Sequence, residues 1–166
     1  TKEKMIASSV AVYGELFYDI FDSVEAKDNS EIWEESNFSR GIYFRKEYGA
    51  NLPFNYPVIA GWNNGKATSI KSVDLTAPIY SSDKDILQKI SIHIDELADF
   101  AGTENPWGKD KIVVNESQIT SRELIVIIPD NSQDDRRKVL QECVSLADSK
   151  GIVLVIETYG VSEKYI

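Results

Sequence analysis

Cysteine and histidine are nearly absent from this chain of 166 residues, which contains only Cys143 and His93. A single cysteine cannot form an internal disulfide, so a disulfide scaffold is excluded and a reducing compartment fits. A single histidine argues against a His-rich zinc site and against Ser-His-Asp catalysis. No apolar run approaches the roughly 18–20 residues that a membrane-spanning helix requires. The chain starts at Thr1 rather than at a methionine, so we expect a piece of a longer protein.

Basic charge is also scarce, with 18 Lys and Arg against 27 Asp and Glu and a formal net charge of −9. This balance argues against a nucleic-acid-binding protein, whose phosphate-binding surface is usually basic. A few local cations together with a bound divalent metal can still attract phosphate to an acidic protein. Hydrophobic residues make up 42% of the chain, enough for the core of one compact domain.

Four segments show the apolar periodicity of amphipathic helices. We expect these helices at residues 2–25, 31–48, 86–100 and 133–149. Gly49 is expected to end the second helix, and Ser132 to cap the last. Residues 1–30 are interpreted as a helical lead-in, and residues 31–166 as the main domain.

Five segments have the composition of strands. They are residues 56–62, 66–72, 111–114, 124–128 and 152–156. The turn Asn64-Gly65 predicts that the first two form an antiparallel hairpin. The last two are fully apolar and flank a helix, which is typical of a buried parallel pair. We therefore predict an α/β (α+β) fold with a mixed central sheet flanked by helices.

The returning strand of the hairpin carries the most informative chemistry. Ser69 and Lys71 are two residues apart, so they share one face of the sheet. A lysine beside a metal-binding group is a nuclease-like arrangement, in which the metal lowers the pKa of a bound water and the lysine neutralises charge on the phosphate. Ser-x-Lys is common in strands, and such a lysine usually points to solvent. The spacing alone therefore does not establish a site.

Longer stretches of the chain carry a family resemblance. The run NLPFNYPVIAGWNNGKATSIKSVDL, with SRGIYF before it and ITSRELIVIIPDNSQDDRRKVLQECVSLADSKGIVLVI after it, resembles the C-terminal nuclease toxin domains of contact-dependent growth inhibition and haemagglutinin-like proteins. Those domains belong to the PD-(D/E)xK restriction-endonuclease-like superfamily. The resemblance covers roughly residues 39–156 and implies a restriction-endonuclease-like core.

The resemblance also implies a set of site residues. Lys71 matches the catalytic lysine, and Ser69 stands where the superfamily more often has a metal-binding Glu or Asp. The metal-binding aspartate is expected at the position of Ala60, and the glutamate of the preceding helix at Glu47, with Glu34 and Glu35 as alternatives. The implied cofactor is a divalent metal, Mg²⁺, Mn²⁺ or Zn²⁺.

Alanine at position 60 departs from this pattern, because a methyl group cannot bind a metal. One explanation is an Asp→Ala change introduced to inactivate a toxin that kills its expression host. The other is a natural variant with a different or inactive site.

Further residues are weighed as contacts to substrate. Asp74 is either functional or the end of the strand and cap of the next turn. Nucleic-acid contacts are expected from four cations on or beside the site: Arg40, Arg45, Lys46 and Lys66. His93 lies in an apolar helix pattern and is expected to be a half-buried or surface histidine rather than a catalytic one. Trp107 either stacks on a base or covers the end of the core.

The functional expectation is a metal-dependent endonuclease that cleaves DNA or tRNA in competing bacteria. By resemblance, it is part of a larger secreted or cell-surface exoprotein, acts in the target-cell cytoplasm and is blocked by a cognate immunity protein. The alternative is a non-catalytic binding module, such as the immunity protein itself. The acidic charge and Ala60 favour this alternative.

Overall fold

The computed structural model describes residues 31–104, 106 and 111–166. Within these residues, four strands form one sheet in the order β1-β2-β3-β4. The strands are β1 (Gly61–Asn63), β2 (Lys66–Ser72), β3 (Ser121–Ile128) and β4 (Ile152–Thr158). β1 pairs antiparallel with β2, whereas β2 with β3 and β3 with β4 are parallel. The predicted mixed sheet is therefore confirmed.

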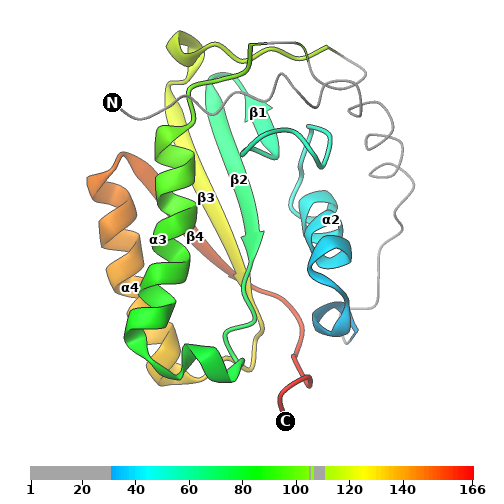
Figure 1. Ribbon diagram of the computed structural model, residues 1–166, viewed down its shortest axis with the longest axis vertical. Coiled ribbons are helices and arrows are strands. Elements are labelled where there is room, and N and C mark those ends of the chain that lie inside the picture. Colours follow the sequence, from blue (N-terminus) through cyan, green and yellow to red (C-terminus); the bar gives the residue numbers. More distant parts are fainter. Residues whose placement is uncertain (1–30, 105, 107–110) are drawn as a thin grey trace.

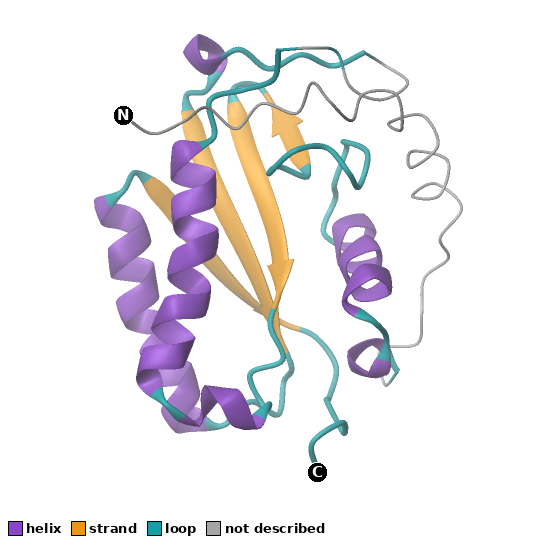
Figure 2. Cartoon of the chain, in the orientation of Figure 1, coloured by secondary structure: helices purple, strands orange, loops and turns teal. Residues whose placement is uncertain are grey.

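Helices cover both faces of this sheet (Figures 1 and 2). The helices are α2 (Asn37–Glu47), α3 (Asp83–Asp99) and α4 (Asp134–Ser149), with short 3₁₀ turns η2 (Ile32–Glu34), η3 (Pro78–Ser81) and η4 (Glu116–Gln118). α3 and α4 pack together on one face, and α2 lies against β2 on the other. None of the described helices is long and apolar enough to cross a membrane.

The turn between β1 and β2 matches its prediction. Asn64 and Gly65 both have positive φ, 49° and 84°, as a two-residue hairpin turn of type I′ requires. A Cβ at Gly65 would lie 2.4 Å from Oγ1 of Thr120, so this position also needs glycine for space. The turn fixes the register of the hairpin, which pairs Gly61 with Thr68.

The two faces of the sheet have different cores. The larger cluster, between the sheet and α3 and α4, is mainly aliphatic and includes Ala67, Ile90 and Val126. The smaller cluster, on the α2 face, is aromatic. Its members are Ile32, Trp33, Tyr43, Phe44, Ala60, Ile70 and Ile127. Residues of β2 alternate between the faces, so Ile70 and Ser72 face α2 while Ser69 and Lys71 face α3.

One predicted strand is shorter than expected, and another is not a strand. Residues 56–60 form a loop, and only Gly61–Asn63 is strand. Pro57 has no N–H for a ladder, and Val58 adopts a positive φ of 65°, both of which oppose an extended strand. Residues 111–114 form no strand either; Lys111 has a φ of 53°, and an isolated bridge joins Gly102 to Asn115 nearby.

The helix predicted at residues 31–48 is shorter than expected. It starts at Asn37, because Ser36 is extended and its side chain caps the backbone N–H of Ser39 at 3.2 Å. Gly49 follows its end with a φ of 84°, as predicted. The hydroxyl of Ser132 does not cap α4; it donates to the carbonyl of Pro129 at 2.6 Å. The helix predicted at residues 2–25 and the contact predicted for Trp107 lie outside the described residues.

Candidate functional site

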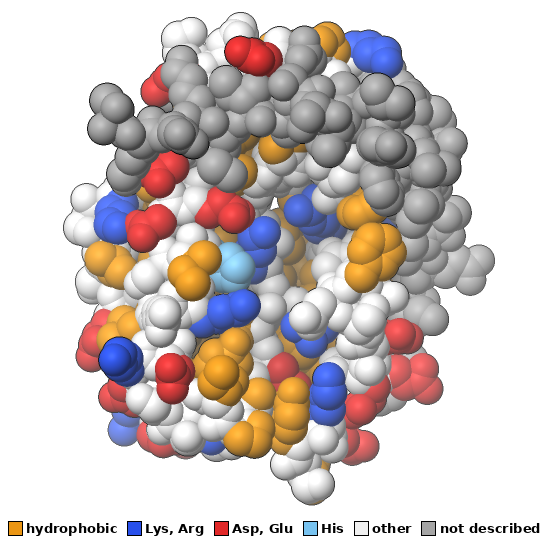
Figure 3. Space-filling model, viewed as in Figure 1, with side chains coloured by type: hydrophobic (Ala, Val, Ile, Leu, Met, Phe, Trp, Pro, Cys, Tyr) orange, Lys and Arg blue, Asp and Glu red, His pale blue; other side chains and the backbone are white. Residues whose placement is uncertain are grey.

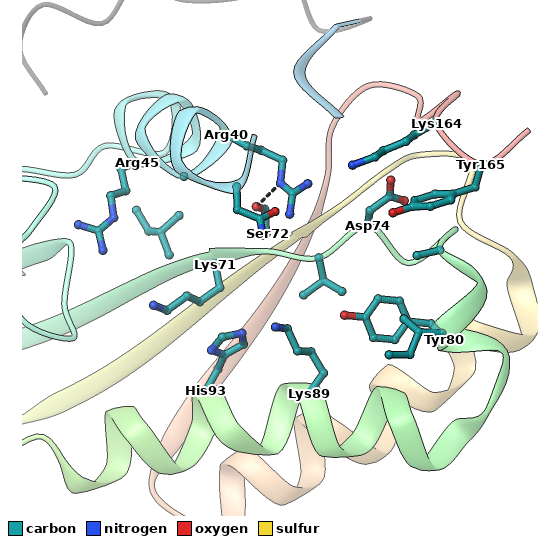
Figure 4. A pocket seen from close by; sticks show the side chains of 16 residues that line it. Arg40, Arg45, Lys71, Ser72, Asp74, Tyr80, Lys89, His93, Lys164 and Tyr165 are labelled. Atoms are coloured by element: carbon teal, nitrogen blue, oxygen red, sulfur yellow. Dashed lines mark hydrogen bonds between the residues drawn. The ribbon is translucent and has the colours of Figure 1, made fainter. Parts of the chain in front are cut away.

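A pocket of about 490 Å³ opens between α2 and α3 beside the second half of β2 (Figure 4). Its position follows from the shortness of β1, whose last pairing with β2 is at Thr68. The rest of β2 has no strand on this side in the described part of the chain. Figure 3 shows this hollow with blue side chains around it.

The pocket is positively charged, although the whole chain is acidic. Five cationic side chains line it: Arg40, Arg45, Lys71, Lys89 and Lys164. Asp74 is the one carboxylate among the lining residues, against a net charge of −9 for the chain. An enclosed group of like charges concentrates the field, so this hollow attracts anions to an otherwise repelling surface.

Lys71 lies at the centre of the pocket. Its Nζ is 3.6 Å from Oε1 of Glu96 on α3, and its side chain is 25% exposed. Burial lowers the pKa of Lys71, the carboxylate of Glu96 opposes this change, and the positive charges of Arg45 and Lys89 add to it. A bound anion would relieve the repulsion among these cations.

Arg45 and Arg40 reach the pocket from α2. Burial lowers the pKa of Arg45 to about 10, against the attraction of Glu96, and the guanidinium donates to the carbonyl of Phe54. Arg40 is only 9% exposed. Its Nε donates to Oγ of Ser72 at 2.9 Å, and its guanidinium lies over the ring of Trp33 at 5.2 Å from the centroid. Both arginines are therefore held in place before any ligand binds.

His93 points into the pocket from α3 (Figure 4). Burial, together with the charges of Lys71 and Lys89, lowers its pKa to about 4, so the imidazole is neutral at pH 7. Its Nδ1 is buried and has no hydrogen-bond partner among the described residues. A neutral imidazole between two lysines can accept a hydrogen bond from a group that enters the pocket.

Asp74 follows the end of β2 and caps the next turn. One carboxylate oxygen accepts from the backbone N–H of Thr76 at 3.1 Å and from its hydroxyl at 2.5 Å. The other accepts from the hydroxyl of Ser162 at 2.5 Å. Both oxygens therefore make contacts within the protein itself. These contacts correspond to the structural one of the two roles predicted for Asp74.

The residues expected to bind metal are not brought together. Glu47 is exposed and does not line the pocket. Ser69 is 1% exposed on the α3 face, and Ala60 is fully buried in the aromatic cluster of the α2 face. The described residues contain no group of three or more His, Cys, Asp or Glu side chains that could hold a metal ion. The donor set of the described residues therefore does not fit a metal.

A local irregularity explains the placement of Ala60. Its N–H donates to the carbonyl of Thr68 at 2.8 Å, although Thr68 is already paired in register with Gly61. Ala60 and Gly61 thus both lie opposite Thr68, as in a β-bulge. As a result, the side chain of Ala60 faces α2 and does not share a face with Ser69. Ala60 does not line the pocket, whereas Ile70, a member of the same buried cluster, does.

Two of the four residues predicted to contact nucleic acid line the pocket, and two do not. Arg40 and Arg45 line the pocket, whereas Lys46 does not. Lys66 lies at the opposite end of β2, where its Nζ is 3.6 Å from Oε1 of Glu123.

The sequence-based expectation missed the contribution of α3. Lys89, His93 and Glu96 have the spacing i, i+4, i+7, which is one polar stripe beside the apolar stripe of the helix. That spacing was available in the sequence. The contributions of Lys164 and Tyr165 depend on the path of the C-terminal segment and had no comparable signal.

Comparison with known proteins agrees with this architecture. The family model described as "CDI toxin restriction endonuclease-like domain" matches residues 40–157. A solved structure titled "CdiA-CT/CdiI toxin and immunity complex from Yersinia pseudotuberculosis" matches with a TM-score of 0.56 at 20% identity, covering 69% of this chain and 97% of that chain. No curated protein matches.

The fold is thus that of a restriction-endonuclease-like toxin domain, as the sequence resemblance implied. The family match spans more than half of the chain, so the chain belongs to the CDI toxin restriction endonuclease-like domain family.

Proposed function

We propose that this chain is the nuclease domain of a contact-dependent growth inhibition toxin and that its cationic pocket binds the phosphodiester backbone of DNA or tRNA. One observation carries the proposal: five cations, Lys71 among them, line one pocket in a chain whose net charge is −9. A phosphodiester has the charge and size that this hollow accommodates.

The residues of the pocket have complementary roles in this proposal. Lys71, Arg45 and Lys89 neutralise the scissile phosphate, and the charge that develops on it during attack is stabilised by the same groups. His93 is neutral at pH 7 and lies between Lys71 and Lys89, so it can accept a hydrogen bond from the attacking nucleophile and orient it. Glu96 keeps the ammonium of Lys71 in position.

We also propose that the family's hydrolysis depends on Mg²⁺, Mn²⁺ or Zn²⁺, although the described residues of this chain do not bring together the carboxylates that it needs. Position 60 is where one is missing. We infer that Ala60, in the buried cluster to which the pocket residue Ile70 also belongs, replaces an aspartate. Whether the replacement was introduced or is natural, the chain as it stands binds substrate better than it cleaves it.

The test is the variant Ala60→Asp, assayed for cleavage of plasmid DNA and of tRNA with Mg²⁺, Mn²⁺ and Zn²⁺ in turn. Ala60→Asn is the matched control, because it adds the same volume without the charge. We expect metal-dependent cleavage by Ala60→Asp and none by the parent or by Ala60→Asn. Absence of cleavage in every metal, from a variant that melts cooperatively, would overturn the metal-dependent proposal.

The proposed partner is a cognate immunity protein, as in the toxin and immunity complex named for the Yersinia structure. The acidic surface of this chain predicts basic patches on that partner, which would speed association. We further propose that the domain is carried by a larger exported protein and acts in the cytoplasm of the target cell.

A second candidate function is a non-catalytic binding module, favoured by the missing donor at Ala60. The immunity-protein version of it fits less well, because the matching family is the toxin member of the pair. Expression in bacteria separates the candidates. A nuclease with Ala60→Asp stops growth, whereas a binding module with the same change leaves growth unaffected.

A further inference from the structure

The end of the pocket farthest from α2's C-terminus has a different character from the centre. Tyr80 from η3 and Tyr165 from the C-terminal segment line it, together with Lys164 and Arg40 (Figure 4). Two aromatic rings and two cations thus share one end of the cavity. The proposed phosphate chemistry around Lys71 uses neither tyrosine.

The C-terminal segment is held firmly enough to form a wall. The backbone carbonyl of Ser162 accepts from Nδ2 of Asn131 at 2.9 Å, and its N–H donates to Oδ1 of the same residue at 3.0 Å. The buried hydroxyl of Ser162 donates to Asp74, and the N–H of Asp130 donates to the carbonyl of Gly160 at 2.7 Å. These bonds place Lys164 and Tyr165 at the pocket.

Arg40 is a buried cation, 9% exposed. Its carbon and nitrogen atoms are held by Trp33 and Ser72, and among the described residues it forms no ion pair. Burial lowers its pKa, while the negative charge of Asp74 opposes that change from a distance. A buried guanidinium with donors left over is a ready anion site, because an incoming phosphate supplies the charge that the protein does not.

The tyrosines lie close to this cation. Arg40 is near enough to lower the pKa of Tyr80, against the larger effect of burial, and Tyr165 and Asp74 also act on the same phenol. Tyr165 itself is 46% exposed, so part of its ring is accessible to a ligand. An exposed ring beside an anion site is suited to a ligand with a flat face.

We propose that this end of the pocket is a nucleotide subsite, in which Arg40 and Lys164 hold a phosphate and Tyr80 and Tyr165 contact its base. The inference rests on the proposed nuclease function and adds to it a subsite beside the phosphate that Lys71 holds. Aromatic rings stack only on a base that has left its own stack. The subsite therefore takes an unpaired nucleotide, in a single strand or extruded from a duplex.

The experiment compares adenosine 5′-monophosphate, ribose 5-phosphate and inorganic phosphate, each titrated calorimetrically into the full chain. We expect adenosine monophosphate to bind about tenfold more tightly than ribose 5-phosphate, the scale of one base stacked on an aromatic ring. The variant Tyr165→Leu should abolish this difference and leave the affinity for ribose 5-phosphate unchanged. Lys164→Gln should weaken both sugar phosphates equally.

Tyr48→Leu is the matched control, because Tyr48 lies on the same side of the sheet but does not line the pocket. This variant should leave the ratio of the two affinities, for adenosine monophosphate and for ribose 5-phosphate, unchanged. Equal binding of adenosine monophosphate and ribose 5-phosphate by the parent would overturn the subsite, as would a ratio that survives Tyr165→Leu. If inorganic phosphate still binds and Lys71→Met removes that binding, the proposed function stands while the subsite fails. If no phosphate ligand binds, both fail.

Discussion

Two lysines of the same strand, Lys66 and Lys71, show how strongly the surroundings of a side chain determine its role. Each has its Nζ 3.6 Å from a glutamate oxygen, Glu123 for Lys66 and Glu96 for Lys71. The side chain of Lys66 is 47% exposed beside the hairpin turn, whereas that of Lys71 is 25% exposed in a pocket with other cations.

The two lysines differ in their environment and not in the distance from Nζ to the glutamate oxygen. An exposed ion pair is screened by water and contributes little. At the other end, burial and neighbouring cations lower the pKa of Lys71, and a single glutamate does not balance the charge around it. One strand thus carries an ordinary surface pair at its start and an anion-binding centre at its end.

The largest expected effect separates the two lysines in the Ala60→Asp protein. Lys71→Met should lower the cleavage rate by about 100-fold, the typical consequence of removing one group that stabilises the transition state. Lys66→Met should leave the rate within about twofold, because an exposed pair contributes little. Initial rates on a labelled oligonucleotide measure both. Equal losses in the two variants would remove the distinction between the ends of β2.

A smaller effect concerns pH. The pKa of His93 is lowered to about 4 in the folded chain, below its ordinary value of 6.5. The unfolded state therefore binds the proton first, and the stability contributed by neutral His93 is complete above pH 6.5 and lost as the pH falls toward 4. For a half-buried ring this loss is about 2 kcal/mol.

Urea denaturation at pH 7 and pH 4.5 measures this loss. His93→Gln stays neutral throughout, so it should lose about 2 kcal/mol less than the parent over that interval. Carboxylates that titrate in the same range affect both proteins alike. Identical pH dependence in the two would show that His93 is not held neutral between Lys71 and Lys89.

The smallest effect tests the glutamates. Glu96→Gln removes the negative charge beside Lys71, so oligonucleotide binding should tighten by a few-fold. Glu123→Gln makes the same change beside Lys66 and should alter binding by less than twofold. Fluorescence anisotropy at low salt resolves such differences. If Glu123→Gln tightened the complex instead, the nucleic acid would bind at the Lys66 end of β2, which contradicts the proposal.

Local signals predicted much of the fold. The Asn64-Gly65 turn, the strand Lys66–Ser72 and the parallel pair of β3 and β4 around α4 depend on neighbouring residues and came out as expected. Residues 56–60 did not, because their apolar composition is typical of a strand while Pro57 and the positive φ of Val58 make them a loop. Composition cannot reveal which hydrogen bonds a backbone makes.

The candidate site was predictable only in part, for a similar reason. Lys71, Arg40 and Arg45 lie on the two elements that the hairpin resemblance singled out, and the structure places them in one pocket. His93 was expected to be a half-buried or surface residue without a catalytic role, because its neighbours in the helix are apolar. Its orientation toward Lys71 depends on how α3 crosses the sheet, which the sequence of α3 alone does not specify.

The central claim is that the cationic pocket, in an acidic chain, binds a nucleic-acid backbone. Its most direct test is the affinity of the chain as it stands for a labelled single-stranded oligonucleotide over a series of salt concentrations, beside Lys71→Met and Lys66→Met. The account predicts that Lys71→Met weakens binding by about tenfold and reduces the slope against log salt by about one, while Lys66→Met matches the parent. Binding that is absent at low salt, or that both variants weaken equally, would contradict it.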